Sequence, residues 1–384
     1  MKKKVLFVIE SLSGGGAEKV LTVLLKHIDK TRFDVTLCTV VETGVYMDEV
    51  KKYVSCTSIL GNPNRKTFLG NAWYRFKYQC VYNWLPLKWV YRLFVPQGND
   101  VEVAFVEGFA TKLMAASTNK KAKKLAWVHT DLSKNPWTLS HKVFVNKDEE
   151  GSAYLKFDQV IAVSETARLN FIKRYAFNPQ KIVRIYNPLD KDDILNKSKE
   201  VLDESMCIKN KVRFITIGRL VHQKGYDRLL QVVKRLVADG FDFELWILGE
   251  GEQKASLNKY IKENSLEDRV KLLGFKSNPY KYLKACDCFI CSSRSEGFSL
   301  VIAEAMILGL PILSTYCSGP NELLDEGKYG LLVENSEDGL YKGIRTILTE
   351  NLQNTSDLST LSLLRSASFN LIDIMKTIEQ LFQI

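Results

Sequence analysis

Residues 288–306 constrain the fold of this chain more than any other stretch. They begin with an apolar run at 288–291, continue with a polar segment, and end in a helical pattern closed by Gly309 and Pro311. This order predicts a buried strand, a loop and a helix. In open α/β sheets such a unit forms ligand sites, because free N–H groups and the helix dipole converge at the helix N-terminus.

The composition is that of a globular protein of two domains. The 384 residues are 46% hydrophobic and 26% charged, enough for two domains that each bury a core. Residues 2–9 start like a signal peptide, but the apolar run is short and ends before Glu10, so we predict a first strand. No apolar stretch reaches about 18 residues, so no membrane-spanning helix is expected.

The cysteines and the charges narrow the function classes. The C-x-x-C of Cys288 and Cys291 has no second pair or nearby histidine, so we predict core cysteines, no metal site and a reduced, cytosolic chain. Residues 1–187 carry 29 lysines and arginines against 16 acidic residues, and the remainder carries 25 against 28. The basic first half predicts an anionic partner, either nucleic acid or a membrane surface.

Two glutamates flank the predicted helix N-terminus of residues 288–306. Glu296 is followed by Gly297, Phe298, Ser299 and Leu300, and Glu304 comes after seven intervening residues. This arrangement resembles the E-x7-E signature of retaining glycosyltransferases of family 4. The resemblance implies an α/β protein with the GT-B fold, in which two Rossmann-like domains face each other across a cleft.

A second motif lies earlier, after the apolar strand predicted at residues 212–217. Gly218-Arg219-Leu220, followed by Lys224-Gly225, resembles the G-R-L…K-G motif of the same family. A guanidinium and an ammonium in one loop can clamp a diphosphate and neutralise the charge on a leaving nucleoside diphosphate. Alternatively, Arg219 and Lys224 are two solvated cations of a surface loop.

Further glycine turns follow predicted strands at Gly249 and at Gly274-Phe275. In the family, the counterpart of Gly274-Phe275 borders the nucleotide base.

The N-terminal half also has strands that end in polar loops. Gly14, Gly15 and Gly16 separate the first strand from a helical pattern, but they do not match G-x-G-x-x-G, which argues against a dinucleotide oxidoreductase. They could form a plain tight turn. The resemblance implies that Gly15 and Gly16 contact the donor phosphates or the acceptor, and that His129, at the end of a predicted strand, lies beside the donor sugar.

Residues 62–95 combine basic and aromatic side chains without an acidic one. The basic residues are Arg65, Lys66, Arg75, Lys77, Lys88 and Arg92, and the aromatic residues include Phe68, Trp73, Tyr74, Phe76, Tyr78, Tyr82, Trp84, Trp89, Tyr91 and Phe94. A helix pair packed on the domain core and an interfacial pair on anionic lipid both fit. Nucleic-acid binding lacks a recognition motif. The family resemblance favours the membrane.

The resemblance places the domain boundaries. We expect an acceptor-side domain at residues 1–187, completed by an amphipathic helix at about 365–384, and a nucleotide-sugar domain at residues 188–364. The charged stretch 190–211 is expected to be the linker. Asp190 and Asp192 form a D-x-D there, away from any strand end, and we expect no metal.

The expected function follows from the resemblance. Arg219 and Lys224 hold the diphosphate, the amides around residues 297–300 add dipole stabilisation, and Glu304 binds the ribose hydroxyls. Glu296 orients the donor sugar, and the leaving phosphate accepts the acceptor's proton without a metal or cofactor.

We expect a nucleotide-sugar donor, a UDP-sugar, and a saccharide or polyprenyl-diphosphate-linked acceptor in surface-polysaccharide synthesis. The enzyme would act on the inner face of the cytoplasmic membrane, attached through residues 62–95 and without nucleic acid. Two alternatives stay open: a GT-B sugar-nucleotide epimerase, and a non-catalytic partner of an active transferase.

Overall fold

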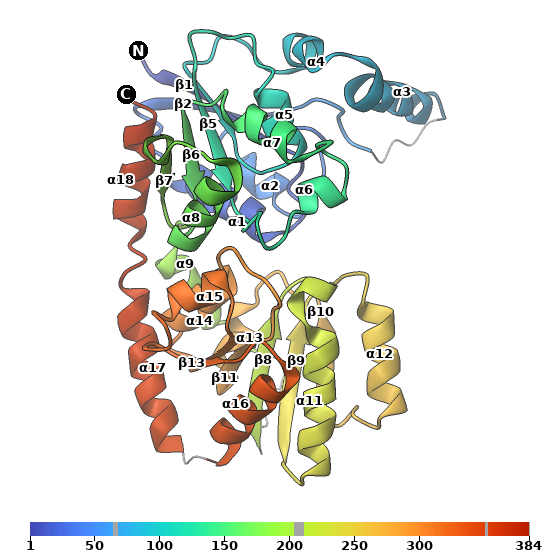
Figure 1. Ribbon diagram of the computed structural model, residues 1–384, viewed down its shortest axis with the longest axis vertical. Coiled ribbons are helices and arrows are strands. Elements are labelled where there is room, and N and C mark those ends of the chain that lie inside the picture. Colours follow the sequence, from blue (N-terminus) through green and yellow to red (C-terminus); the bar gives the residue numbers. More distant parts are fainter. Residues whose placement is uncertain (64–67, 203–210, 350–351, 384) are drawn as a thin grey trace. The chain divides into compact units, whose positions relative to one another are not determined.

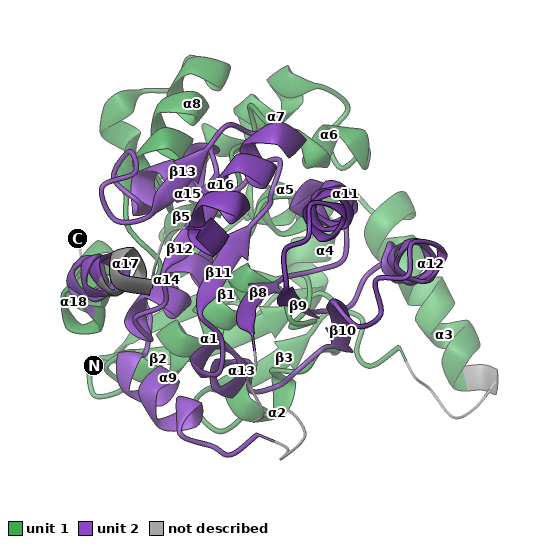
Figure 2. Cartoon of the chain, turned by 90° about the horizontal axis from the view of Figure 1, so that it is seen from below, with its two compact units in different colours: residues 1–188, 371–384 green, residues 189–370 purple. Residues whose placement is uncertain are grey.

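The computed structural model describes residues 1–63, 68–202, 211–349 and 352–383, and in it the chain divides into two compact units. Unit 1 contains residues 1–188 and 371–384, and unit 2 contains residues 189–370. Figure 2 shows the units in green and purple. Because unit 1 takes residues from both ends of the sequence, unit 2 is inserted into it.

Unit 1 is built on a seven-stranded parallel sheet in the order β3-β2-β1-β4-β5-β6-β7 (Figure 1). Its strands are β1 (Lys3–Ile9), β2 (Phe33–Thr39), β3 (Ser55–Ser58), β4 (Val101–Ala104), β5 (Lys123–Val128), β6 (Gln159–Ala162) and β7 (Ile182–Arg184). The apolar run predicted as a first strand is β1, whose residues 5–9 are at most 1% exposed.

The helices of unit 1 connect these parallel strands. They are α1 (Gly16–His27), α2 (Met47–Val50), α3 (Phe68–Gln79), the π-helix η1 (Cys80–Trp84), α4 (Leu87–Phe94), α5 (Phe109–Met114), α6 (Trp137–Ser140), α7 (Lys147–Tyr154), α8 (Glu165–Tyr175) and the 3₁₀ turn η2 (Pro179–Lys181). Ser164 caps α8 by accepting a hydrogen bond from Ala167 N at 3.2 Å.

Unit 2 has a six-stranded parallel sheet in the order β10-β9-β8-β11-β12-β13. Its strands are β8 (Val212–Ile217), β9 (Phe243–Leu248), β10 (Val270–Gly274), β11 (Cys288–Cys291), β12 (Ile312–Thr315) and β13 (Leu331–Val333). The predicted strand at residues 288–291 is confirmed, and Cys288 and Cys291 are buried and free, as expected of core residues.

The helices of unit 2 include one that the sequence did not predict. They are α9 (Lys191–Ser198), the 3₁₀ turn η3 (His222–Lys224), α11 (Tyr226–Ala238), α12 (Lys254–Glu263), α13 (Tyr280–Lys284), α14 (Leu300–Ile307), α15 (Ser318–Leu323), α16 (Glu337–Thr349) and α17 (Leu352–Ser366). Helix α9 occupies part of the expected linker. Asp190 of the D-x-D caps this helix, accepting from Asp193 N at 3.0 Å, which is a structural role.

The C-terminal helix α18 (Leu371–Leu381) completes unit 1. Phe382 packs edge-on against Phe7 and Phe33, with ring centroids 5.9 and 5.6 Å apart. Glu379 accepts hydrogen bonds from Asp29 N at 2.9 Å and Arg32 Nη1 at 3.0 Å. Among the described residues, no helix has the length and apolar character that crossing a bilayer requires.

Candidate functional site

The candidate site lies at the carboxyl edge of the unit 2 sheet, where the strand order reverses. Strands β8 and β11 are neighbours there, with β9 and β10 on one side and β12 and β13 on the other. The loops that follow them carry the two predicted motifs, residues 218–225 and 292–299. Open parallel sheets bind ligands at this reversal point, so the topology brings the two motifs to the position of a binding site.

Lys224 and Glu296 form an ion pair between the two loops. Ser293 Oγ donates to the same oxygen of Glu296, Oε1, at 2.7 Å, and Glu296 is 7% exposed. Burial opposes the charged ammonium, but the Glu296 carboxylate outweighs it and holds the pKa of Lys224 above its ordinary value. Lys224 is therefore a fixed cation at neutral pH.

Glycines allow these loops to pack closely. Gly225 has φ +69°, and a Cβ there would collide with the carbonyl oxygen of Ser292. Gly249 has φ +145°, and a Cβ there would collide with the carbonyl oxygen of Gly218. Gly249 N also donates to Gly274 O at 2.9 Å. The glycines predicted at the donor site thus bring the loops after β8, β9, β10 and β11 together.

The remaining predicted residues of unit 2 follow β8, β10 and β11 in the chain. Glu304, on α14, is 2% exposed and accepts a hydrogen bond from Tyr280 Oη at 3.4 Å. Arg219 is exposed directly after β8, and Phe275, after β10, is 48% exposed. An exposed guanidinium and an exposed aromatic face are both accessible to a ligand.

Residues 297–300 lead into the N-terminus of α14. The N-cap residue, Ser299, makes no side-chain hydrogen bond to the helix. The amides of a first helical turn have no partner within the helix, so those of α14 remain available to an anion. In unit 1, by contrast, helices α7 and α8 are capped by the side chains of Asn146 and Ser164.

Sequence reasoning missed the residues that hold the site together. Arg228 is 5% exposed and its Nη2 donates to Ser292 O at 2.6 Å and to Ser293 O at 3.0 Å. Thr315 Oγ1 donates to the same Ser293 carbonyl at 2.6 Å. Burial lowers the pKa of Arg228. The available signal was an arginine three positions after the K-G motif, followed by Leu229 and Leu230.

His129, Gly15 and Gly16 belong to unit 1. His129 follows β5, and its Nε2 lies 2.8 Å from Phe105 O. A carbonyl oxygen only accepts, so Nε2 carries the proton, and burial lowers the pKa of His129 to about 4. The imidazole is therefore neutral at pH 7, and its Nδ1 is a hydrogen-bond acceptor.

Two carboxyl groups that the sequence analysis did not select connect neighbouring loops of unit 1. Glu107, after β4, is 3% exposed and accepts from Thr130 N, after β5, at 2.6 Å. Glu10, after β1, accepts from Phe109 N, after β4, at 2.9 Å. Burial raises the pKa of both, to about 7 for Glu107. Strands β1 and β4 flank the reversal point of this sheet.

The glycine loop of unit 1 adjoins a third carboxyl group. Gly15 is the N-cap of α1, and a Cβ at Gly15 would collide with the Glu18 carboxylate. This carboxylate therefore lies over the helix N-terminus, where it interacts favourably with the helix dipole. A phosphate at Gly15 and Gly16 would meet a negative charge already in place.

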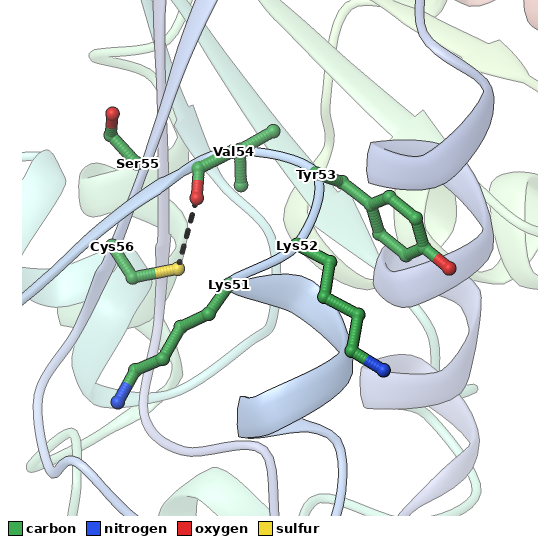
Figure 3. Close-up of a pocket in the computed structure, with 6 residues that line it drawn as sticks. All are labelled: Lys51, Lys52, Tyr53, Val54, Ser55 and Cys56. Atoms are coloured by element: carbon green, nitrogen blue, oxygen red, sulfur yellow. Dashed lines mark hydrogen bonds between the residues drawn. The ribbon is translucent and has the colours of Figure 1, made fainter.

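A surface pocket of unit 1 lies apart from all of these residues. It has a volume of about 510 Å³ and is lined by residues 51–56, which lead into the edge strand β3 (Figure 3). Cys56 Sγ donates to Val54 O at 3.6 Å. The pocket contains none of the predicted site residues.

Among the described residues, no three His, Cys, Asp or Glu side chains lie together as the ligands of a metal ion would.

Comparison with known proteins defines the class. The described fold matches Anabaena HepE in complex with UDP and glucose, with a TM-score of 0.76 and 21% identity over 98% of both chains. It also matches TarM, with a TM-score of 0.74 and 14% identity over 100% of this chain and 99% of TarM. Two Rossmann-like parallel sheets of this kind are the GT-B fold of glycosyltransferases.

The sequence comparisons identify the family. Residues 14–193 match the model for Glycosyltransferase Family 4, and residues 199–359 match that for Glycosyl transferases group 1. A Campylobacter jejuni N-acetylgalactosamine-N,N'-diacetylbacillosaminyl-diphospho-undecaprenol 4-alpha-N-acetylgalactosaminyltransferase is 30% identical over 350 residues, 89% of each chain. The Rhizobium meliloti lipopolysaccharide core biosynthesis glycosyltransferase LpsE is 32% identical over 36% of this chain and 39% of its own. The chain belongs to glycosyltransferase family 4 and is a glycosyltransferase.

Proposed function

We propose that this enzyme transfers a sugar from a UDP-sugar to a saccharide or polyprenyl-diphosphate-linked saccharide, with retention of anomeric configuration, in surface-polysaccharide synthesis. The observation that carries the proposal is the Lys224–Glu296 pair at the reversal point of the unit 2 sheet, beside the uncapped N-terminus of α14. The complex of Anabaena HepE with UDP-glucose supports the donor. The acceptor named for the Campylobacter jejuni relative supports a lipid-linked saccharide.

The donor is held by charge and by amide groups of unit 2. Arg219 and Lys224 bind the diphosphate, and the first-turn amides of α14 add further donors. Glu304 accepts hydrogen bonds from the ribose hydroxyls. The base lies against the exposed ring of Phe275. Each interaction uses a group that the fold already fixes or exposes.

Transfer breaks the bond between the anomeric carbon and the diphosphate oxygen, and the electron pair stays on the diphosphate. The acceptor oxygen bonds to the anomeric carbon, and its proton passes to the leaving phosphate oxygen. Arg219 and Lys224 stabilise the charge on the leaving group. Glu296 orients the sugar and stabilises its oxocarbenium-like character.

Arg219 and Lys224 supply the positive charge that a metal ion would otherwise bring to the diphosphate. We therefore expect the enzyme to remain active in EDTA. Activity that depended on added calcium or magnesium would contradict this expectation.

Unit 1 supplies hydrogen-bonding groups for sugar hydroxyls. His129 Nδ1 accepts a hydrogen bond from a sugar hydroxyl, because Nε2–H already donates to the Phe105 carbonyl. Gly15 and Gly16 offer backbone amides beside the Glu18 carboxylate, which favours a neutral sugar over a phosphate. Within the alternatives left by the sequence, this loop therefore fits the acceptor.

The helix pair α3 and α4 is the proposed contact with the inner face of the cytoplasmic membrane. Together with the π-helix η1 between them, which contains Val81 and Trp84, they pack on the core through Val81, Val90 and Tyr91, which are buried. The other face exposes an apolar set without acidic neighbours: Trp73 (58%), Phe76 (50%), Trp84 (61%), Trp89 (53%) and Leu93 (61%). Arg65 and Lys66 of the predicted segment lie outside the described residues. Exposed tryptophans flanked by Lys and Arg suit an anionic lipid surface.

The donor assignment is tested by calorimetry with UDP, GDP and ADP and by transfer assays with their sugars. Arg219→Ala should weaken UDP binding and lower kcat/KM by about 100-fold, the usual loss for one transition-state donor, without changing the melting temperature. NMR of the product should show the donor's anomeric configuration. Unchanged turnover in Arg219→Ala would contradict the phosphate clamp, and an inverted product would contradict retention.

The membrane contact is tested by sedimentation with vesicles containing anionic lipid. Replacing Trp73, Trp84 and Trp89 by alanine should abolish co-sedimentation, while the matched double variant Leu155→Ala/Leu169→Ala, at exposed positions outside the helix pair, should bind like wild type. Wild-type protein that stays in the supernatant at physiological salt would rule the contact out.

A further inference from the structure

The two motif loops of unit 2 are also joined by Arg294, which lies outside the G-R-L…K-G and E-x7-E signatures. Arg294 N donates to Gln223 O at 2.7 Å. Its guanidinium donates from Nη1 to His222 O at 2.7 Å, and it binds both carboxylate oxygens of Asp227 at 2.7 and 2.8 Å. Gln223 Nε2 donates in the opposite direction, to Ser295 O, at 2.7 Å. Five hydrogen bonds thus connect residues 222–227 to residues 294–295.

These bonds lie on both sides of Lys224 in the first loop and directly before Glu296 in the second. His222 and Gln223 immediately precede Lys224, and Arg294 and Ser295 immediately precede Glu296. Asp227 lies in the first turn of α11, which anchors the far end of the first loop. Both backbones are fixed within two or three residues of the charged pair, so this connection, together with the bonds of Arg228 to Ser292 and Ser293, sets the separation of Lys224 and Glu296.

The Arg294–Asp227 contact differs in geometry from an ordinary surface ion pair. Exposed pairs contribute little to stability, and Arg235–Asp338, in the same unit, is of that kind: its side chains are 54% and 72% exposed. The Arg294 and Asp227 side chains are 30% and 37% exposed, and the contact is a two-bonded fork with an additional backbone acceptor. A fork of this type fixes direction as well as distance.

We propose that Arg294 and Asp227 are positioning residues for sugar transfer: they hold Glu296 and Lys224 at the separation and orientation that the donor sugar requires. The inference rests on the proposed function, because Glu296 matters for turnover only if it faces the donor sugar. It assigns the arginine to the chemical step and not to nucleotide affinity, since Arg294 does not itself reach the diphosphate clamp in this scheme.

The test uses two conservative variants and their matched controls in the full-length chain. Arg294→Lys keeps the charge and loses the fork, and Asp227→Asn keeps the shape and loses the charge. Arg235→Lys and Asp338→Asn make the same changes in the exposed pair that joins α11 to α16. For each variant, kcat and KM are measured with the UDP-sugar found active for wild type, and the dissociation constant is measured with UDP alone.

We expect Arg294→Lys and Asp227→Asn to lower kcat by about 10- to 100-fold, the scale of a misplaced reacting group, with UDP affinity within about three-fold of wild type. The double variant should lose no more than the worse single one, because the two residues act as one unit. Control variants should match wild type. Wild-type kcat in both test variants would overturn the proposal, as would losses of kcat that only parallel losses of UDP affinity and melting temperature.

A second readout does not depend on the donor. In protein labelled with ¹⁵N and ¹³C at lysine, the Lys224 ammonium should give an NMR signal because its protons exchange slowly with water. The signal is assigned to Lys224 by its absence from the spectrum of Lys224→Arg. Arg294→Lys should broaden this signal, and Arg235→Lys should not. If wild type binds no UDP, the proposed function fails while this signal still decides the positioning role: an unchanged Lys224 signal in Arg294→Lys would refute it.

Discussion

The loops at the carboxyl edges of the two sheets are held together by opposite chemistry. In unit 2, cationic side chains donate to backbone carbonyls: Arg228 to Ser292 and Ser293, and Arg294 to His222. In unit 1, carboxyl groups accept from backbone amides: Glu107 from Thr130, and Glu10 from Phe109. The same parallel-sheet architecture thus gives a cationic edge suited to a diphosphate and an acidic edge suited to neutral hydroxyls.

The largest effect is expected when the cation of the Lys224–Glu296 ion pair in unit 2 is removed. Lys224→Met leaves Glu296, 7% exposed, without its counter-charge and should destabilise unit 2 by about 3–5 kcal/mol. Adding Glu296→Gln should recover most of the loss. Hydrogen exchange resolved by peptide should show the change in unit 2.

The exposed pair between Glu250, after β9, and Lys254, the first residue of α12, provides the control. Lys254→Met should change stability by less than about 1 kcal/mol. If Lys224→Met were equally harmless, the ion pair would contribute no more than a surface contact, and the contrast between the two edges would lose its strongest element.

The second test uses the pH dependence of unit 1. The pKa of Glu107 is raised from 4.5 to about 7, so between these values the folded state binds more protons and stability falls as pH rises. The pKa of His129 is lowered from 6.5 to about 4, so stability rises with pH across that range. Each contribution amounts to about 3 kcal/mol, and in wild type they oppose each other between about pH 4.5 and 6.5.

Single variants should separate the two contributions. Glu107→Gln should make the urea midpoint of unit 1 rise between pH 4 and 6.5, and His129→Asn should make it fall between pH 4.5 and 7. Identical pH profiles for wild type and both variants would show that neither group titrates as its burial requires.

The third test concerns close packing of the unit 2 loops. Gly225 and Gly240 stand at opposite ends of α11 with φ of +69° and +87°, but only at Gly225 would a Cβ meet a backbone carbonyl, that of Ser292. Gly240→Ala should cost about 1 kcal/mol for backbone strain alone, and Gly225→Ala about 2 kcal/mol more. Equal losses in thermal denaturation would mean that the loops can separate without penalty.

The smallest change in stability is expected from removing the N-cap side chain of one helix in each unit. Ser164→Ala removes the hydrogen bond to Ala167 N and should cost about 1 kcal/mol. Ser299→Ala removes no cap from α14 and should leave the melting temperature unchanged. A comparable loss at Ser299 would argue that the first-turn amides of α14 are already satisfied, and that they are not available to phosphate.

The sequence predicted the residues that end strands but not the bonds between loops. Lys224 and Glu296 were recognisable because each follows an apolar strand within a family motif. Arg294 and Asp227 are separated by 67 positions, and only the adjacency of β8 and β11 brings them together. The His129 tautomer depends on a carbonyl of a neighbouring loop, which no local pattern shows.

The expected linker illustrates the opposite case, in which the local signal was present. Residues 190–211 were interpreted from their charge. Asp190 is an N-cap residue, and Asp193 pairs with Lys197 at 2.7 Å, four positions on. A cap followed by an acid–base pair at this spacing is typical of a helix, and α9 occupies residues 191–198. High charge alone was a poor criterion for an extended connection.

The discontinuous make-up of unit 1 has a consequence for synthesis on the ribosome. Phe7 and Phe33 precede unit 2 in the chain, yet Phe382, which packs against both, is translated after the whole of unit 2. The contiguous unit 2 can fold during translation, whereas the nascent unit 1 waits with two phenylalanine rings that Phe382 does not yet cover, and chaperones can bind them. A chain that ends before residue 371 would leave these rings uncovered permanently, and such a product is a natural substrate for proteolysis.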